Sequence, residues 1–263
     1  KDVGDQLAGR AEDARGQEQV DLSWTSARAY FFHGVSYYYK GMLYEEGSSE
    51  RRGALDKTVE FLLDFVWENE DNILGGYAYL YLGLAKKGMQ EPDESLEYLN
   101  VAASNYPVPD MQTYPVDYRK WTDLYYQGYF KLAEYCNELK LTAGTEYRDI
   151  AIEKITGKEG MLERLPDALD RKFGHLALLQ LARAYLGLKD GGKAMYWATK
   201  VSQRGEELME VTEWGAATAY MANQLINQII VEDPDAEQPP DVLLKAARGK
   251  KASREWAQAV RTY

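Results

Sequence analysis

Apolar residues recur at spacings of three and four along nearly the whole chain, and this period limits the possible folds more than any other feature. Such a spacing places apolar side chains on one face of an α-helix, whereas a half-buried strand needs strict alternation of apolar and polar residues. Alternation of that kind is scarce in this sequence. The sequence therefore predicts an all-α protein.

The same pattern predicts about ten helices joined by short breaks. We expect helices over residues 22–46, 52–69, 75–88, 92–105, 116–139, 146–165, 171–187, 191–204, 207–231 and 241–260. The breaks contain glycines and helix-capping residues, for example at Gly47-Ser48 and Asp190-Gly191. Because these connections are short, consecutive helices should pack antiparallel. Residues 106–115 are rich in proline and predict a loop or a crossover.

Two segments near the C-terminus differ in composition from the helical repeat domain that we expect over residues 1–231. Residues 232–241 are acidic and contain Pro234 and Pro239, so they predict a linker. Residues 242–263 are basic and amphipathic, and they predict a helix that caps the last helix pair. Two alternatives stay open for this helix: binding to a partner or to the acidic body of the chain, and contact with a membrane surface or nucleic acid.

Residues 76–109 carry small and large residues in the order expected of two helices that cross closely, and residues 175–208 carry a second such set. Small residues allow two helices to approach, and large apolar residues fill the space between the pair and its neighbour. The positions are Tyr79, Leu82, Gly83, Ser95, Leu99, Ala102 and Pro107 in the first segment, and Leu178, Leu181, Ala182, Tyr185, Ala194, Ala198 and Val201 in the second.

Both segments resemble the tetratricopeptide repeat, a helix pair of about 34 residues whose copies stack into a solenoid. Weaker matches to the first helix of the repeat lie near Tyr30 and Leu124. The small residues Gly34, Gly83 and Gly128 lie farther apart than about 34 residues, so the repeat length here is irregular. The resemblance implies a right-handed α-solenoid of antiparallel helix pairs.

Tetratricopeptide proteins commonly bind an extended peptide or a partner helix on the concave surface that their first helices form. The resemblance implies a groove lined by Arg28, Phe31, Tyr38, Tyr77, Tyr81, Lys87, Tyr125, Tyr126, Tyr129 and Arg183. Tyrosine suits such a surface because it combines a large contact area with a polar tip. The alternative is that these aromatic side chains simply pack in the core.

No catalytic or metal-binding pattern occurs in the sequence. His33 and His175 are the only two histidines, and neither has a partner at metal-ligand spacing. Cys136 is the single cysteine, so no intramolecular disulfide can form, and we expect a core position for it. Phosphate-binding loops, dinucleotide fingerprints and nucleophile elbows are also lacking. The sequence therefore predicts a protein that is not an enzyme and needs no cofactor.

The sequence favours a scaffold or adaptor that binds a peptide or helix of another protein, alone or as one subunit of a larger assembly. The alternative is a helical-solenoid enzyme or a small-molecule-binding protein whose pocket the sequence does not reveal. Nucleic acid is disfavoured as a partner because the net charge is −11. No run of about 18 apolar residues predicts a transmembrane segment, and we do not expect peripheral membrane contact either.

The segment that follows residues 92–105 also bears on location. Its sequence Asn105-Tyr106-Pro107, with Tyr114-Pro115 further on, resembles the helix endings of bacterial envelope tetratricopeptide lipoproteins. The resemblance implies an exported, envelope location in preference to a cytoplasmic one. A chain that begins at Lys1 rather than Met agrees with that expectation.

Overall fold

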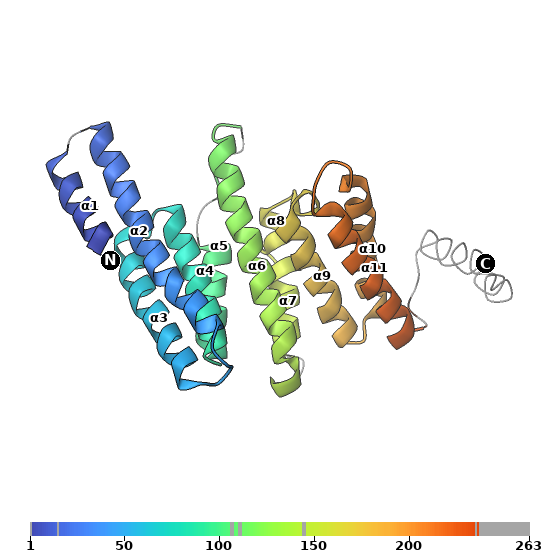
Figure 1. The fold of residues 1–263 in the computed structure, drawn as a ribbon. Helices are drawn as coiled ribbons and strands as arrows, with labels where there is room; N and C mark the ends of the chain where they lie inside the picture. Colours follow the sequence, from blue (N-terminus) through green and yellow to red (C-terminus); the bar gives the residue numbers. More distant parts are fainter. Residues whose placement is uncertain are drawn as a thin grey trace. The chain divides into compact units, whose positions relative to one another are not determined.

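The structure is a computed structural model that describes residues 2–14, 16–105, 108–109, 112–143, 146–234 and 236. These residues form α-helices and one short 3-10 helix, without a strand among them (Figure 1). The predicted all-α class is therefore confirmed. The predicted basic helix over 242–263 and most of the predicted linker over 232–241 lie outside the described residues.

The helices follow one another with short connections. They are α1 (Asp2–Asp13), α2 (Gln17–Met42), α3 (Ser49–Asn69), α4 (Ile73–Gly88), α5 (Pro92–Ser104), α6 (Pro115–Ala143), α7 (Glu146–Thr156), α8 (Met161–Arg164), η1 (Ala168–Asp170), α9 (Lys172–Gly187), α10 (Gly191–Leu208) and α11 (Gly215–Glu232). Within the part of the chain described, no helix is both long enough and apolar enough to cross a bilayer.

Helix-capping side chains explain why several helices begin where the sequence predicts a break. The Ser48 hydroxyl accepts a hydrogen bond from Arg51 N at the start of α3, at 3.2 Å. The Asn72 side chain accepts two such bonds at the start of α4, and Asp190 accepts one at the start of α10. Each cap satisfies a backbone N–H group that has no partner within its own helix.

Apart from shifts of several residues at helix ends, the helices differ from the prediction in three places. The helix α1 was not predicted. The expected helix over 146–165 is divided into α7 and α8. At the break, Gly157 N donates a hydrogen bond to Glu153 O and Gly160 N donates one to Gly157 O. The expected helix over 207–231 begins only at Gly215, since α10 continues to Leu208 and the Thr212 hydroxyl caps α11 by accepting a bond from Gly215 N at 3.1 Å.

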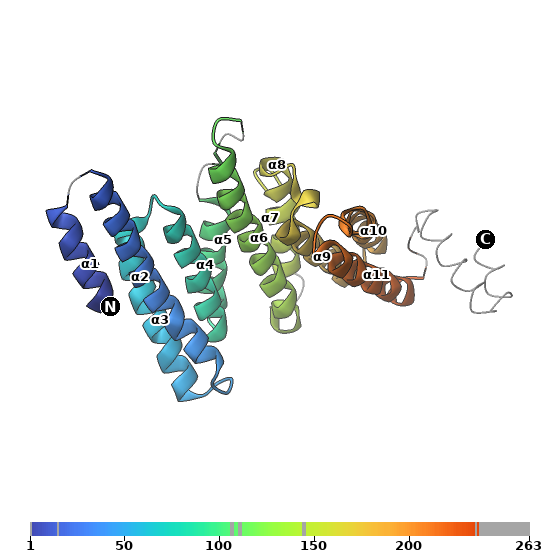
Figure 2. The ribbon, with the colours of Figure 1, turned by 45° about the horizontal axis from the view of Figure 1, so that its top comes forward.

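The helices divide into two compact units, with the division between Gly128 and Tyr129 inside α6. In unit 1, each of the helices α1 to α5 packs against the next, and α2 also contacts α4 (Figures 1 and 2). The main core of this unit lies between α2, α3 and α4, and it consists of Phe31, Val35, Leu62, Phe65, Val66, Ala78 and Leu82.

Unit 2 repeats this order of contacts. The helix α7 packs against α9, α9 against α10 and α10 against α11, while α9 also contacts α11. In both units, two helices that are separated by one intervening helix therefore touch directly. This is the contact order of stacked helix pairs. The handedness of stacking and its continuation from one unit to the next stay predictions.

The small residues of the repeat pattern lie where helices cross closely. A methyl group added at Gly83 would lie 2.6 Å from Leu99 Cγ, and one added at Gly128 would lie 2.8 Å from Ala103 N. The buried Ser95 hydroxyl donates a hydrogen bond to Gly83 O at 2.8 Å, which ties α5 to α4 at this crossing. The prediction that Gly83 serves a close helix crossing is thus confirmed.

Candidate functional site

Unit 1 has a row of aromatic rings where α2 meets α4. We call it the aromatic seam; it consists of Phe31, Phe32, Tyr38 and Tyr39 from α2 and Tyr81 from α4. Edge-to-face contacts join these rings, with centroids 5.3 Å apart for Phe31 and Phe32 and 5.4 Å apart for Tyr38 and Tyr81. The Tyr39 and Tyr81 hydroxyls are 2.8 Å apart and share a hydrogen bond. Each ring is therefore held by another ring of the seam.

The seam has a buried side and an exposed side. Phe31 lies in the core of unit 1, and Tyr38 and Tyr81 are half-buried. In contrast, Phe32 is 54% exposed and Tyr39 is 56% exposed. Large apolar groups that remain exposed while fixed by a rigid support are typical of protein-binding sites.

Further exposed side chains continue the seam along α2. Trp24, Arg28 and Phe32 are spaced by four residues, as are Tyr39 and Leu43, and seven residues separate Phe32 from Tyr39. These spacings place all five on one face of the helix. All five are exposed, and Arg28 forms no ion pair with any other described residue. The face thus carries four apolar side chains and the unpaired cation of Arg28, and the exposed Asp21 lies on it three residues before Trp24.

The ionisation of the half-buried tyrosines agrees with a neutral surface. Burial, followed by the hydrogen bond with Tyr39, raises the pKa of Tyr81. Burial also raises the pKa of Tyr77, with a further rise from Asp123, while a hydrogen bond with Gln127 lowers it. Both phenols therefore stay protonated near neutral pH.

Several of the predicted groove residues meet at this seam. Phe31, Tyr38 and Tyr81 belong to it, Arg28 lies beside it, and Tyr77 packs half-buried against the same core. Lys87 is half-buried in the last turn of α4. The sequence did not single out Tyr39, which is exposed in the structure, because the sequence does not show which side of α2 remains uncovered.

The three tyrosines predicted on α6 are buried instead. Tyr125 and Tyr126 are 0% exposed, and Tyr129 is 1% exposed. The Tyr129 hydroxyl accepts a hydrogen bond from Arg164 Nη1 at 3.1 Å, and burial raises the pKa of Tyr129. These three rings are buried in this structure, as the packing alternative expects.

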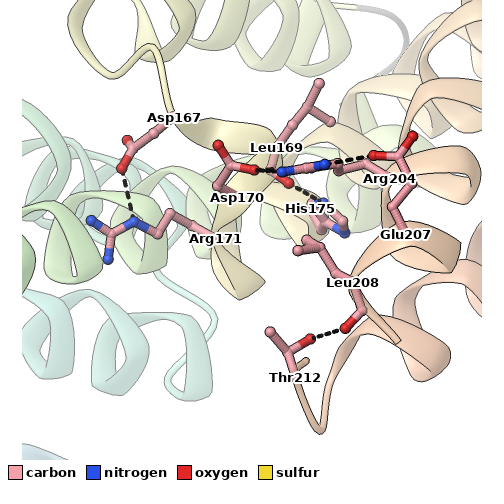
Figure 3. A network of polar contacts seen from close by, with 9 residues as sticks. All are labelled: Asp167, Leu169, Asp170, Arg171, His175, Arg204, Glu207, Leu208 and Thr212. Carbon is pink, nitrogen blue, oxygen red and sulfur yellow. Dashed lines mark hydrogen bonds and ion pairs between the residues drawn. The ribbon is translucent and has the colours of Figure 1, made fainter. Parts of the chain in front are cut away.

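A polar network in unit 2 contains the buried His175 (Figure 3). Its Nε2 lies 2.6 Å from Leu169 O and its Nδ1 lies 3.0 Å from Thr218 Oγ1, so both ring nitrogens are engaged. Nearby, Arg204 donates hydrogen bonds to Asp170 and Glu207. Burial lowers the pKa of His175. The network connects η1 with α9, α10 and α11.

The other histidine and the single cysteine also pack against neighbouring side chains. His33 packs edge-to-face against Tyr37 and Phe61. Cys136 is fully buried, and burial raises the pKa of its thiol to about 12. No three His, Cys, Asp or Glu side chains gather as metal ligands within the described ranges.

Unit 2 has a pocket of about 730 Å³ that the sequence did not indicate. We call it the basic pocket; its lining consists of Asn137 from α6, Arg148 from α7, Arg183, Leu186 and Gly187 from α9, Lys189 after α9, and Gln228, Glu232 and Asp233 at the end of α11. Of the predicted groove residues, only Arg183 lines it, and the side chain of Arg183 is exposed. Of the other two cations, Lys189 follows Arg183 by six residues, whereas Arg148 comes from a distant part of the sequence.

Comparison with known proteins adds no functional assignment. A scan against models of protein families found no match, and a search of curated proteins found no similar sequence.

Proposed function

We propose that the protein is a non-catalytic scaffold that binds another protein through the aromatic seam. The observation that carries this proposal is the exposure of Phe32 and Tyr39 on a rigid aromatic support. The resemblance of residues 76–109 and 175–208 to tetratricopeptide repeats supports it, since first helices face the partner in that family. A right-handed solenoid of helix pairs is part of the same proposal.

The chemistry of the seam defines the partner. The exposed face of α2 offers Trp24, Phe32, Tyr39 and Leu43 over just more than five helical turns. A partner helix or extended segment with apolar side chains at matching intervals would bury these groups. An acidic residue beside its apolar face would pair with Arg28. The expected partner is therefore an amphipathic segment with an acidic edge.

The area available on each ring sets the expected energy. Full burial of an aromatic side chain contributes about 1.5–3 kcal/mol, and Phe32 is roughly half exposed, so the remaining half contributes about 1 kcal/mol. Loss of ring packing between the two proteins adds to this. We expect Phe32→Ala to weaken binding at least about tenfold, which corresponds to about 1.4 kcal/mol.

The test is affinity purification of the tagged protein from its source cells, with mass spectrometry of the proteins that co-purify. Wild type is compared with Phe32→Ala, with Tyr39→Ala and with the control Trp67→Ala, which removes an 87% exposed ring from α3 outside the seam. The proposal requires partners that the control retains and both seam variants lose.

Two controls make the outcome specific. Circular dichroism melting must show that both seam variants keep the wild-type helical content and stability, which their exposed positions predict. Arg28→Glu should weaken binding of an acidic partner by charge repulsion. Partners that remain bound to both seam variants would refute the aromatic seam as the binding site.

A further inference from the structure

The basic pocket combines features that a purely structural crevice does not need. Arg148, Arg183 and Lys189 line it in a chain whose net charge is −11. The helix α9 contacts α7 and also α11, so the pocket lining extends from Arg148 on α7 across α9 to Glu232 at the end of α11. It therefore has a cationic part and an acidic end.

Arg148 is held in place but not satisfied. Its Nη1 donates a hydrogen bond to Gly187 O, and a Cβ at position 187 would overlap its guanidinium, so only glycine permits this approach. Its buried Nε has no hydrogen-bond partner among the described residues. An unpaired donor on a charged group is costly to bury. An anionic acceptor in the pocket would relieve that cost.

Arg183 and Lys189 add two cations that no neighbour neutralises. Both are exposed, and neither forms an ion pair within the described ranges. The nearest acidic residue in sequence, Asp190, pairs with Lys193 at 2.9 Å instead. Two guanidinium groups and an ammonium favour a ligand with carboxylate or phosphate oxygens.

Acceptor groups line other parts of the pocket. Asn137 Nδ2 donates to Gln180 O at 2.8 Å, which fixes the amide and leaves Asn137 Oδ1 buried without a donor. Glu232 accepts a hydrogen bond from Gln228 at 2.6 Å but pairs with no cation of the described chain. Glu232 is the last residue of α11, where the helix dipole also favours positive charge. This end suits a ligand ammonium.

We propose that the basic pocket binds a free acidic amino acid, a small molecule with two carboxylates and one ammonium. Its net charge of −1 neutralises a lining of three cations and two carboxylates. The volume of about 730 Å³ lies within the range of small-molecule sites. No aromatic residue is among the described residues that line the pocket, so a nucleobase would find no stacking surface on them. The inference goes beyond the scaffold function and does not depend on it.

The first experiment is isothermal titration calorimetry of the full chain with three probes. They are L-glutamate, glutarate, which has the same carboxylates without the ammonium, and inorganic phosphate. We expect glutamate to bind at least about tenfold more tightly than glutarate or phosphate, the factor that about 1.4 kcal/mol gives. Absence of saturable glutamate binding, or equal affinity for glutamate and phosphate, would overturn the proposal.

Two variants assign the ends of the ligand. Arg183→Gln should weaken glutamate and glutarate together, whereas Glu232→Gln should weaken glutamate alone and so abolish its advantage over glutarate. Lys158→Gln, an exposed change in unit 2 outside the pocket lining, is the matched control and should bind as wild type. If Arg183→Gln and Lys158→Gln bind glutamate equally, the bound ligand does not occupy the basic pocket and the proposal fails.

Discussion

Substitution of glycine by alanine at two helical positions of unit 1 separates close packing from helix propensity. Gly53 lies in α3 and is exposed, and nothing lies within 4 Å of an added methyl group. Gly83 lies in α4, where the same methyl group would lie 2.6 Å from Leu99 Cγ and 3.1 Å from Leu99 N. Both changes gain the same helix propensity, about 1 kcal/mol.

The difference between the two variants therefore measures the overlap at the crossing of α4 and α5. Leu99 is fully buried and cannot rotate into solvent, and the Ser95–Gly83 hydrogen bond holds the two helices together. Overpacking of this kind costs about 1–3 kcal/mol. We expect Gly53→Ala to stabilise the protein by about 0.5–1 kcal/mol and Gly83→Ala to unfold about 1–3 kcal/mol more easily than Gly53→Ala.

Urea unfolding followed by far-ultraviolet circular dichroism measures this difference. Because both positions lie in unit 1, the same transition reports both variants. The midpoint should shift without a change in slope, since neither variant alters the area exposed on unfolding. Gly83→Leu should destabilise still further. If Gly83→Ala proved as stable as Gly53→Ala, the close crossing would be absent and the helix-pair packing of this unit would be wrong.

Three further predictions concern buried polar groups. Burial lowers the pKa of His175, with Arg204 adding to this effect and Asp170 opposing it. As the pH drops, the unfolded chain therefore takes up a proton at this residue before the folded chain does. Urea midpoints should fall below about pH 6.5, and they should fall less steeply in His175→Asn. Equal slopes for the two proteins would contradict this. Lys86→Met should lower the free energy of unfolding by about 1–3 kcal/mol. The change removes the ammonium that lies 2.8 Å from the Glu91 carboxylate and 2.7 Å from the Glu94 carboxylate. A urea midpoint equal to that of the wild type would contradict this prediction. The buried thiol of Cys136, with a pKa of about 12, should not react with iodoacetamide at pH 8 until urea unfolds the chain. Mass spectrometry of the alkylated protein measures the reaction. Rapid labelling of the folded protein would disprove the burial of Cys136.

The sequence predicts features that depend on neighbouring residues better than those that depend on distant ones. The helical period and the close crossing at Gly83 follow from local spacing, and both are confirmed. The burial of Tyr125 and Tyr126 does not follow from spacing, because it depends on which faces of α6 other helices cover. Consecutive tyrosines point about 100° apart, so the sequence alone cannot select the exposed one.

The helix α1 and the basic pocket were missed for related reasons. The helix α1 is short and mostly polar, so its sequence gives little sign of a packed helix. Its contact with α2 is known from the structure, in which Ala11 is buried and Gly4 lies against the Tyr30 ring. The pocket needs Arg148 and Lys189 on one surface, and they meet only because α7 packs against α9. The close approach of Arg148 to Gly187 could not be predicted either, because these two residues are also distant in sequence.

The two candidate sites differ in charge, and this difference gives a test of both. Binding at the aromatic seam depends on apolar area, with Arg28 as its one cation, so its affinity should change little between low and physiological salt. Glutamate binding in the basic pocket depends on three cations, of which Arg183 and Lys189 are exposed to screening. Its dissociation constant should therefore rise severalfold over the same change in salt. A seam interaction that weakened as steeply as glutamate binding would show that charge, rather than the exposed rings of Phe32 and Tyr39, holds the partner.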